Sequence, residues 1–363
     1  MAGELVKVPD LLRNWPWGRR LNSHYEQART ESLAWFTRFR AFDPNSQDAF
    51  DRCDFAKLAM LAYLYKDFAR CRVGSDLMTL FYVFDEYTDV EDETVTRQMS
   101  QIIMDGLRNP NKARPEGECP LGEIARDFWA RGRQVSAPMA ERHFLETMQL
   151  YADAVTQQSE DRCHDRIRDI ASYWQVRRHS SGCLPSFAAM EFEMDVPEEV
   201  YRHPLVEKLR EDAMLLICAG NDLYSYPVER ARGHALHNLV TAVMYQFNMG
   251  PQAAADWIGK WSDGIVKDFL QCKSELPSWG SDVDLQVSRY VDALAQWVRG
   301  NDDWSFESQR YFGVVGGVVR RVREIYMLPL VDVQDARSLA HRDEVDAESS
   351  GVAAMQIRRD LAV

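Results

Sequence analysis

Apolar residues recur at spacings of three and four over long stretches of the chain, which is the periodicity of helices that bury one face. The clearest stretches are 46–67, 72–91, 136–157, 198–222, 251–275 and 281–299. Pro138, Pro197 and Pro251 stand at or just before the beginning of three of them, where a proline suits the first helical turn. Strand signals are weak along the whole chain. The pattern therefore predicts an all-α fold.

Short polar segments separate the predicted helices. Loops are expected near 41–46, 108–120, 158–162, 231–236 and 276–280, where Pro, Gly, Asn, Asp or Ser cluster. None of them is long enough to be an interdomain linker, so residues 1–330 are predicted to form a single helical domain. After about Val331 charged residues and serine dilute the apolar pattern, and 331–363 are expected to be a peripheral or frayed tail.

The composition is that of a soluble globular protein. Of the 363 residues, 46% are hydrophobic and 27% charged, and 43 Lys and Arg stand against 56 Asp and Glu, which gives a formal net charge of −13. This balance, with no cluster of Lys and Arg, argues against a protein that binds nucleic acid or an anionic membrane. No stretch of about 18 apolar residues occurs, so no membrane span is expected.

The cysteines indicate a reducing compartment. They are odd in number and scattered, with no CxxC pair and no histidine at a zinc-finger spacing. The first residues contain no apolar run of signal-peptide length. We therefore expect buried thiols in a cytoplasmic protein. The seven are Cys53, Cys71, Cys119, Cys163, Cys183, Cys218 and Cys272.

Two carboxylates end a strongly apolar helical segment. The run 77–84 is followed by Asp85 and Asp89, which share one helix face because they are four residues apart. The same face carries Phe81 one turn earlier, so the carboxylates are expected at the end of a buried stripe. The alternative is an acidic helix end at the surface, since further acidic residues follow at 91–93.

A second polar set follows another apolar run, 213–218. Asn221, Ser225 and Glu229 are spaced four residues apart and span about 12 Å of helix. Their amide, hydroxyl and carboxylate oxygens are hard ligands, which suit Mg²⁺ and suit zinc or copper poorly. Taken alone, the set is also explained as polar residues at the end of a helix.

The two sets together are more specific than either one. Two buried helices that each end in oxygen ligands are expected to hold Mg²⁺ ions between them. Mg²⁺ that is bound by few protein groups commonly bridges to the phosphates of a substrate. The pair therefore indicates a diphosphate-binding cavity with apolar walls.

Four segments resemble the motifs of class I terpene synthases. The string FDEYTD at 84–89 resembles the aspartate-rich motif of that family, and NDLYSYPVE at 221–229 resembles its Asn/Ser/Glu triad. The segment YWQVRRHSSG at 173–182 is similar to the one that bears the diphosphate-sensing arginine, and WSFESQRYFG at 304–313 resembles the C-terminal Arg-Tyr motif. The resemblance covers roughly residues 8 to 325, and it is closest to the mushroom sesquiterpene synthases.

Two features depart from the family pattern. Glu86 stands where many members carry a second Asp, a change that is common in the fungal branch. Many bacterial members have a Lys immediately before the last Glu of the triad, whereas Val228 stands here, and Pro227 removes a backbone donor inside the expected helix. The diphosphate contacts are therefore expected to depend more on three arginines, Arg178, Arg230 and Arg310.

The resemblance implies a fold, a reaction and a cofactor. The fold is a single-domain helical bundle around an apolar active-site cavity, and the reaction is the ionisation of farnesyl diphosphate to a sesquiterpene and diphosphate. The cofactor is a set of three Mg²⁺ ions that stabilise the leaving group. Asp85 is expected to bind two of the ions with Asp89 nearby, and Asn221, Ser225 and Glu229 are expected to bind the third.

The resemblance also implies contacts to the substrate. Arg178 is expected to be the diphosphate sensor, chosen over Arg177 because it lies four residues before Gly182. The carbonyl of Gly182, at a helix break, is expected to help trigger ionisation. Arg310 and Tyr311 are expected to add donors from the C-terminal side. Aromatic side chains are expected to line the apolar wall, the candidates being Phe81, Tyr82, Phe187, Trp304 and Tyr311.

Other functions stay open at this point. One is a catalytically silent prenyl-diphosphate-binding protein, which has no need for five oxygen ligands. Another is a chain-elongating prenyltransferase, which normally has a second aspartate-rich motif in place of Asn/Ser/Glu. The product is open as well, from cyclic hydrocarbons and alcohols to acyclic nerolidol or linalool if geranyl diphosphate is also used. The family's habit is a monomer or a loose homodimer.

Overall fold

Helices account for almost all regular structure in the computed structural model, which describes residues 4–65 and 67–327. The prediction of an all-α fold is confirmed, apart from two short strands, β1 (Leu5–Lys7) and β2 (Glu324–Tyr326), which pair antiparallel. The expected tail, 331–363, lies outside the described residues. The longer helices are α1 (Tyr25–Thr37), α2 (Pro44–Arg52), α3 (Phe55–Ala62), α4 (Phe68–Thr88), α5 (Glu93–Arg108), α6 (Leu121–Val135), α7 (Pro138–Cys163), α8 (Ile170–Ser180), α9 (Cys183–Met190), α11 (Pro204–Ala231), α12 (Leu239–Phe247), α13 (Pro251–Ser274) and α14 (Ser281–Glu307). The shorter ones are α10 (Glu198–Tyr201), α15 (Gly316–Val322) and the 3₁₀ turns η1 (Glu191–Glu193), η2 (Ala235–His237) and η3 (Gly313–Val315).

Many helices begin at a residue suited to that position. Proline occupies the first turn of α2, α7, α11 and α13, where its missing N–H is not needed. Aspartate side chains accept a backbone N–H at the start of five helices and so satisfy a donor that has no partner within the helix. These aspartates are Asp43, Asp54, Asp67, Asp92 and Asp169.

The helix predicted at 46–67 is split in two. Asp54 adopts a left-handed backbone conformation (φ 51°) between α2 and α3, and its side chain accepts the N–H of Lys57 to cap α3. Apolar spacing does not register a turn of this kind, because residues on both sides of it are buried.

Two further boundaries differ from the prediction. The segment 198–222 is interrupted after Tyr201, where α10 ends after one turn and Pro204 begins α11. The loop predicted at 158–162 is wrong, because α7 continues to Cys163. The first difference divides the predicted helix, and the second lengthens α7.

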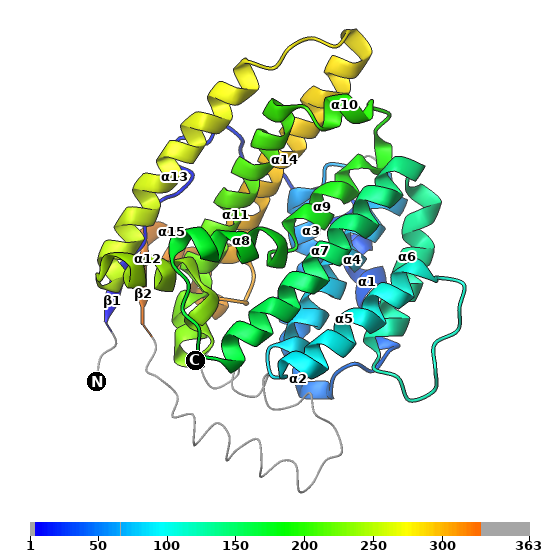
Figure 1. Ribbon diagram of the computed structural model, residues 1–363, viewed down its shortest axis with the longest axis horizontal. Helices are drawn as coiled ribbons and strands as arrows, with labels where there is room; N and C mark the ends of the chain where they lie inside the picture. The colour runs from blue at the N-terminus through cyan, green and yellow to red at the C-terminus, as the bar shows by residue number, and fades with distance from the viewer. Residues whose placement is uncertain (1–3, 66, 328–363) are drawn as a thin grey trace, which may run out of the picture.

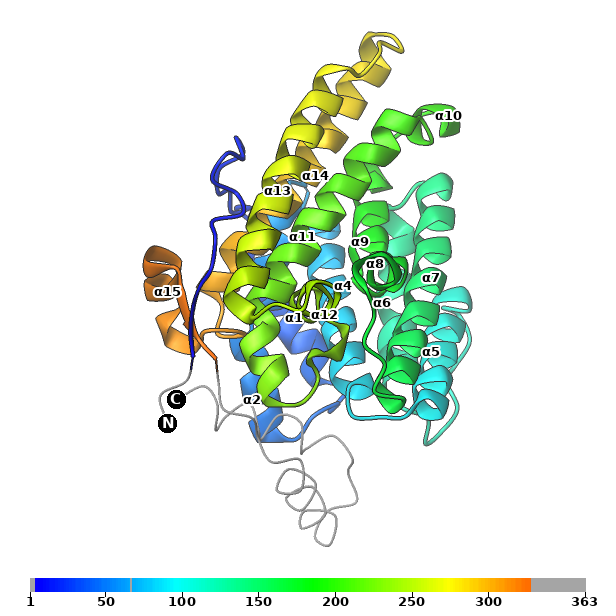
Figure 2. The same cartoon turned by 60° about the vertical axis from the view of Figure 1, so that its left-hand side comes forward.

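The helices α3, α4, α7, α9, α11 and α14 surround the middle of the bundle (Figure 1). Helices α5 and α6 pack outside α4 and α7, and α13 packs along α11. In the turned view α8 is seen nearly end-on while α11 and α13 run lengthwise, so α8 crosses the bundle (Figure 2). Among the described residues, no helix has the length and apolar character needed to cross a membrane.

Helix α14 approaches α3 closely. A Cβ at Gly300 would lie 2.7 Å from the backbone of Leu61, so only glycine permits this contact. The buried amide of Gln296 donates to the Leu61 carbonyl oxygen (3.0 Å), which lies in the last turn of α3 and lacks an intrahelical partner. The contact fixes α14 in the position from which Trp297 and Asn301 reach the middle of the bundle.

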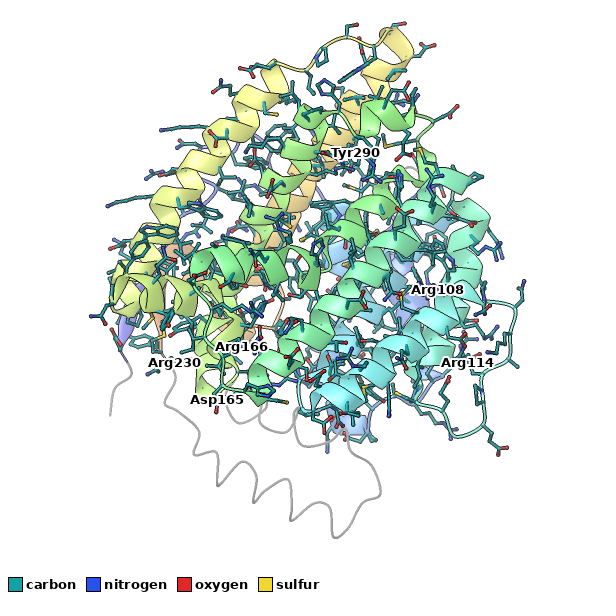
Figure 3. The ribbon with its side chains drawn as sticks, viewed as in Figure 1. Arg108, Arg114, Asp165, Arg166, Arg230 and Tyr290 are labelled. Carbon is teal, nitrogen blue, oxygen red and sulfur yellow. The ribbon has the colours of Figure 1, made fainter. Side chains whose placement is uncertain are left out.

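A polar network closes one end of the bundle. His143 of α7 contacts the buried carboxylate of Glu191 through Nδ1 (2.6 Å) and Glu198 through Nε2 (3.1 Å). Its ring stacks on Tyr201, and Tyr290, labelled near the top of Figure 3, packs beside the same tyrosine. The hydrogen bond to Glu191 raises the pKa of His143, and burial raises the pKa of Glu191. The network therefore favours a charged His143.

Replacing His143 by alanine should lower the free energy of unfolding by about 3 kcal/mol, because the buried Glu191 loses its partner. A raised histidine pKa means that the stabilising effect is fully present below about pH 6.5 and is lost as the pH rises through the folded-state value. Denaturant unfolding of both proteins at about pH 6 and about pH 9 measures this difference. Equal losses at the two pH values would contradict a charged His143.

Candidate functional site

One cavity in the middle of the bundle collects side chains from distant parts of the chain. It is lined by α3, α4, α7, α8, α9, α11 and α14, and by the segments 181–182, 232–237 and 310–311. Along both α4 and α11 the lining changes from apolar to polar toward the C-terminal end of the helix. On α4 Met78 and Phe81 precede Asp85, and on α11 Ile217 precedes Asn221.

The last turns of α4 bring both predicted carboxylates to the cavity. Asp85 and Asp89 line it, whereas Glu86 is buried. Arg310 donates to Asp85 Oδ2 (3.1 Å) and to Glu86 Oε1 (3.3 Å). The side chain of Asp85 nevertheless stays 40% exposed, so its carboxylate is accessible from the cavity.

The predicted polar set on α11 lines the same cavity. The helix continues through Pro227 to its end, so the proline does not interrupt the triad. Asn221, Ser225 and Glu229 all line the cavity. The amide of Asn221 donates to the hydroxyl of Tyr311 (2.6 Å). The cavity therefore brings together all five oxygen ligands that the sequence pointed to.

Glu229 is a buried carboxylate that lies near a second carboxylate, that of Asp222. Burial raises its pKa to about 6, and the nearby Asp222 adds to the rise, while hydrogen bonds with Ser225 and Asn238 act in the opposite direction. A carboxylate of this kind gains most from a cation placed beside it.

The two adjacent arginines of α8 have different partners. Arg177 lines the cavity and donates to the amide oxygen of Asn221 (2.7 Å) and to the carboxylate of Asp222 (2.5 Å). Arg178 lies outside the lining, with 42% of its side chain exposed and a hydrogen bond to Glu211 (3.2 Å). The structure therefore does not support the choice of Arg178 by spacing, because the phase of α8 turns Arg177 to the cavity.

Arg310 and Tyr311 line the cavity from the segment that follows α14. The guanidinium of Arg310 lies 4.4 Å from the ring centre of Tyr82 and contacts the α4 carboxylates. Tyr311 contacts Asn221 of α11 through its hydroxyl. The pair thus connects the two helices that carry the oxygen ligands.

Gly182 lies at the break between α8 and α9. Its φ of +71° is in the left-handed region, where a side chain would be strained. Its carbonyl oxygen accepts the N–H (3.2 Å) and the hydroxyl (2.8 Å) of Ser186 in the first turn of α9. The predicted helix break is confirmed, and Gly182 lines the cavity.

The aromatic lining agrees only in part with the candidates. Phe81, Tyr82 and Tyr311 line the cavity. Phe187 does not, and its ring packs against Trp297 instead. Trp304 is fully buried, lies outside the lining, and donates through Nε1 to the carbonyl of Cys53. Both residues belong to the hydrophobic core. Helical spacing alone does not separate an aromatic residue of the core from one on the cavity wall.

Two further aromatic residues line the cavity and were not among the sequence candidates. They are Tyr151 and Trp297.

The sequence analysis also missed a cationic side chain of α7. Arg162 lines the cavity and donates to the carbonyl oxygens of Thr88 (2.7 Å) and Glu91 (2.9 Å). These bonds hold the end of α4, and the guanidinium lies 4.0 Å from the carboxylate of Asp89. The prediction ended this helix at residue 157, which is why Arg162 was not considered.

The segment after α11 contributes further polar residues. Arg232, His234 and His237 line the cavity. Burial lowers the pKa of His237 to about 3, so its imidazole is neutral. Arg230, labelled at the lower left of Figure 3, is not part of the lining. No sequence signal separated the residues on this segment that face the cavity from those that do not.

The donor atoms fit a hard cation and an anion together. In the described part of the chain no three or more His, Cys, Asp or Glu side chains form a metal-binding group. The oxygen-bearing side chains instead line one cavity from two helices. This arrangement suits Mg²⁺, since this ion needs only one or two carboxylates when phosphates and waters complete its shell. Arg177 and Arg310 each keep a buried Nε without a hydrogen-bond partner among the described residues, and such donors suit an anion.

Comparison with known proteins assigns the family. The profile described as "Terpene synthase family 2, C-terminal metal binding" matches residues 76–268. A Delta(6)-protoilludene synthase from Stereum hirsutum is 46% identical over 326 residues, which are 90% of this chain and 88% of that protein. Sesquiterpene synthase Agr9 from Cyclocybe aegerita is 47% identical over 324 residues, which are 89% of this chain and 87% of that protein.

Solved structures with low sequence identity share the fold. Linalool/nerolidol synthase from Streptomyces clavuligerus aligns with a TM-score of 0.71 at 22% identity, over 80% of this chain and 98% of that one. α-Eudesmol synthase aligns with a TM-score of 0.74 at 19% identity, over 81% of this chain and 98% of that one. The matched range includes both sets of oxygen-bearing residues and both arginines, Arg177 and Arg178. The chain therefore belongs to terpene synthase family 2.

Proposed function

We propose that the protein is a Mg²⁺-dependent sesquiterpene synthase, a carbon–oxygen lyase that acts on farnesyl diphosphate. The observation that carries the proposal is a single cavity in which carboxylates and arginines adjoin an apolar, aromatic wall. An isoprenyl diphosphate has the same two parts, a charged head and an apolar chain. The relatives that are named sesquiterpene synthases, from Cyclocybe aegerita and Postia placenta, support farnesyl diphosphate as the substrate.

The oxygen ligands of α4 and α11 would hold the metal ions. Asp85 is the chief ligand on α4, with Asp89 one turn further, and Asn221, Ser225 and Glu229 form the set on α11. We propose three Mg²⁺ ions between these helices. When bound, they supply Lewis-acid stabilisation of the departing diphosphate.

Arg177 and Arg310 hold the diphosphate head from two sides of the cavity. Each guanidinium is already fixed by a carboxylate, Asp222 in one case and Asp85 in the other, so little ordering is needed when the anion binds. Arg178 has no part in this arrangement, because its side chain contacts Glu211 outside the lining. Tyr311 adds a hydroxyl beside Asn221.

The apolar wall has two tasks during the reaction. It excludes water from the allylic cation, and its ring faces stabilise positive charge. Rings reach the cavity from four helices or segments, which allows them to surround the chain of the substrate. They are Phe81, Tyr82, Tyr151, Trp297 and Tyr311.

We further propose Delta(6)-protoilludene as the product. Relatives of this name from Stereum hirsutum and Armillaria gallica are 46% and 43% identical to this chain over about nine-tenths of its length. The structures of linalool/nerolidol synthase share only the fold and carry no argument about the product.

Incubation of the purified protein with farnesyl diphosphate and Mg²⁺ should release a volatile sesquiterpene, which gas chromatography with mass spectrometry identifies against authentic Delta(6)-protoilludene. A chelator should abolish the product, because the leaving group then lacks its metal ions. Parallel incubations with geranyl and geranylgeranyl diphosphate determine the chain-length preference. If no volatile forms from any of the three, the proposal fails; a different sesquiterpene would refute only the product.

The paired variants Arg177→Lys and Arg178→Lys test which arginine binds the head group. Lysine keeps a cation beside Asp222 but loses the fork that binds phosphate, so Arg177→Lys should raise the inorganic diphosphate concentration needed for thermal stabilisation by about tenfold, in the presence of Mg²⁺. Arg178→Lys should behave like the wild type. The reverse result would return the role to Arg178.

A further inference from the structure

The proposed function leaves one buried polar residue beside the site without a role. Asn238 is fully buried and begins α12, directly after the segment 232–237 that lines the cavity. It does not itself line the cavity, and it belongs to none of the motifs that the sequence analysis recognised. Its side chain is nevertheless bonded to the helix that carries the second set of oxygen ligands.

The amide of Asn238 makes more hydrogen bonds than a helix start requires. Its Oδ1 accepts the N–H of Val240 (2.9 Å), which is the usual bond of an N-cap. Its Nδ2 donates to the carbonyl oxygen of Asp222 (2.9 Å) and to Oε2 of Glu229 (2.9 Å). A cap needs only the acceptor, so both donations serve α11 rather than α12.

The bond to Glu229 fixes the orientation of a cavity carboxylate. Glu229 lines the cavity, and Asn238 holds one of its two oxygens from behind the lining. Glutamate has several rotatable bonds, and holding one oxygen restricts them before any ion arrives. Hydrogen bonds of this kind commonly orient the carboxylates that bind metals.

The start of α12 also holds Asp222, which in turn positions Arg177. The N–H of Leu239 donates to Asp222 Oδ2 (2.8 Å), and the hydroxyl of Tyr173 donates to the same oxygen. The other carboxylate oxygen, Oδ1, accepts from Arg177 (2.5 Å). Asp222 is only 2% exposed, so its carboxylate depends on these protein donors rather than on water. One helix start therefore fixes a carboxylate and an arginine of the cavity together.

We infer that Asn238 is a positioning residue, which orients the carboxylate of Glu229 for Mg²⁺. The inference rests on the proposed function, because it concerns the binding of Mg²⁺ to the α11 set. Partners that orient a metal ligand are typically worth about 10- to 100-fold in metal affinity. Loss of the Asn238 amide is thus expected to weaken Mg²⁺ binding even when the variant remains folded.

The variant Asn238→Ser separates this role from capping. Serine caps helices as well as asparagine does, but its short side chain has a single hydroxyl and does not reach Glu229. The measurement is the Mg²⁺ concentration at the midpoint of the rise in melting temperature, with inorganic diphosphate at a fixed saturating concentration. Asn238→Ser should raise this midpoint by about tenfold or more. The Mg²⁺ concentration that half-saturates turnover should rise by the same factor.

Asn22 offers a matched control. Its amide also donates to two oxygens, the carbonyls of Tyr63 (3.2 Å) and Tyr65 (2.8 Å), and it does not line the cavity. Asn22→Ser should lower the melting temperature of the ligand-free protein, because two carbonyls lose a donor. Its Mg²⁺ midpoint should stay within about twofold of the wild type, since distant sites act independently.

The outcomes distinguish this inference from the proposed function. An unchanged Mg²⁺ midpoint in Asn238→Ser would overturn the inference and leave Asn238 as a cap alone. An equal shift in Asn22→Ser would also overturn it, because the effect would then follow from lost stability. If the wild-type protein shows no rise in melting temperature with Mg²⁺ and diphosphate, the proposed function itself fails. Asn238→Thr, which keeps a capping hydroxyl, carries the same expectations if the serine variant does not fold.

Discussion

Two arginines and the carboxylates that they contact determine the geometry of the site. Arg310 binds Asp85 and Glu86 at the end of α4, and Arg177 binds Asp222 on α11. A buried charge without a partner costs several kcal/mol, so each arginine restricts the position of the helix that carries its carboxylate. The oxygen ligands lie on these same helices. The pairing that stabilises the fold therefore also positions the candidate metal ligands.

The charged side chains and the apolar wall share one cavity because the lining residues of a single helix change from apolar to polar along its length. On α4 the apolar residues precede Asp85, and on α11 they precede Asn221. The break at Gly182 ends α8 after Arg177 has reached the cavity and lets α9 continue in another direction. A substrate with a charged head and an apolar chain matches this division. The division, rather than any single residue, supports a substrate of the isoprenyl diphosphate class.

The sequence predicted the all-α fold and the shared cavity of the two polar sets on α4 and α11, because helical periodicity indicates which residues share a face. Residues four apart share a face, and the two polar sets each continue the face of an apolar stripe, which favoured a place at the interior. The choice between Arg177 and Arg178 required the phase of α8, which spacing to Gly182 does not supply, because the helix ends at Ser180. Phe187 and Trp304 were misplaced because aromatic residues at helical spacing suit the core and the cavity equally well.

Contacts between distant segments explain the remaining differences. Asn238 is nine residues from Glu229 and begins another helix, and no local pattern indicates that the two side chains meet. Arg162 reaches the end of α4 from a helix more than seventy residues away along the chain. Such positions follow from the packing of helices, which a single sequence does not reveal.

A crystal structure of the protein with Mg²⁺ and inorganic diphosphate tests the central claim most directly. The account predicts diphosphate bonded to Arg177 and Arg310, with metal ions contacted by Asp85 on one side. On the other side it predicts contacts to the α11 set, Asn221, Ser225 and Glu229. Diphosphate bound outside the cavity, or metal ions without any contact to α11, would contradict it.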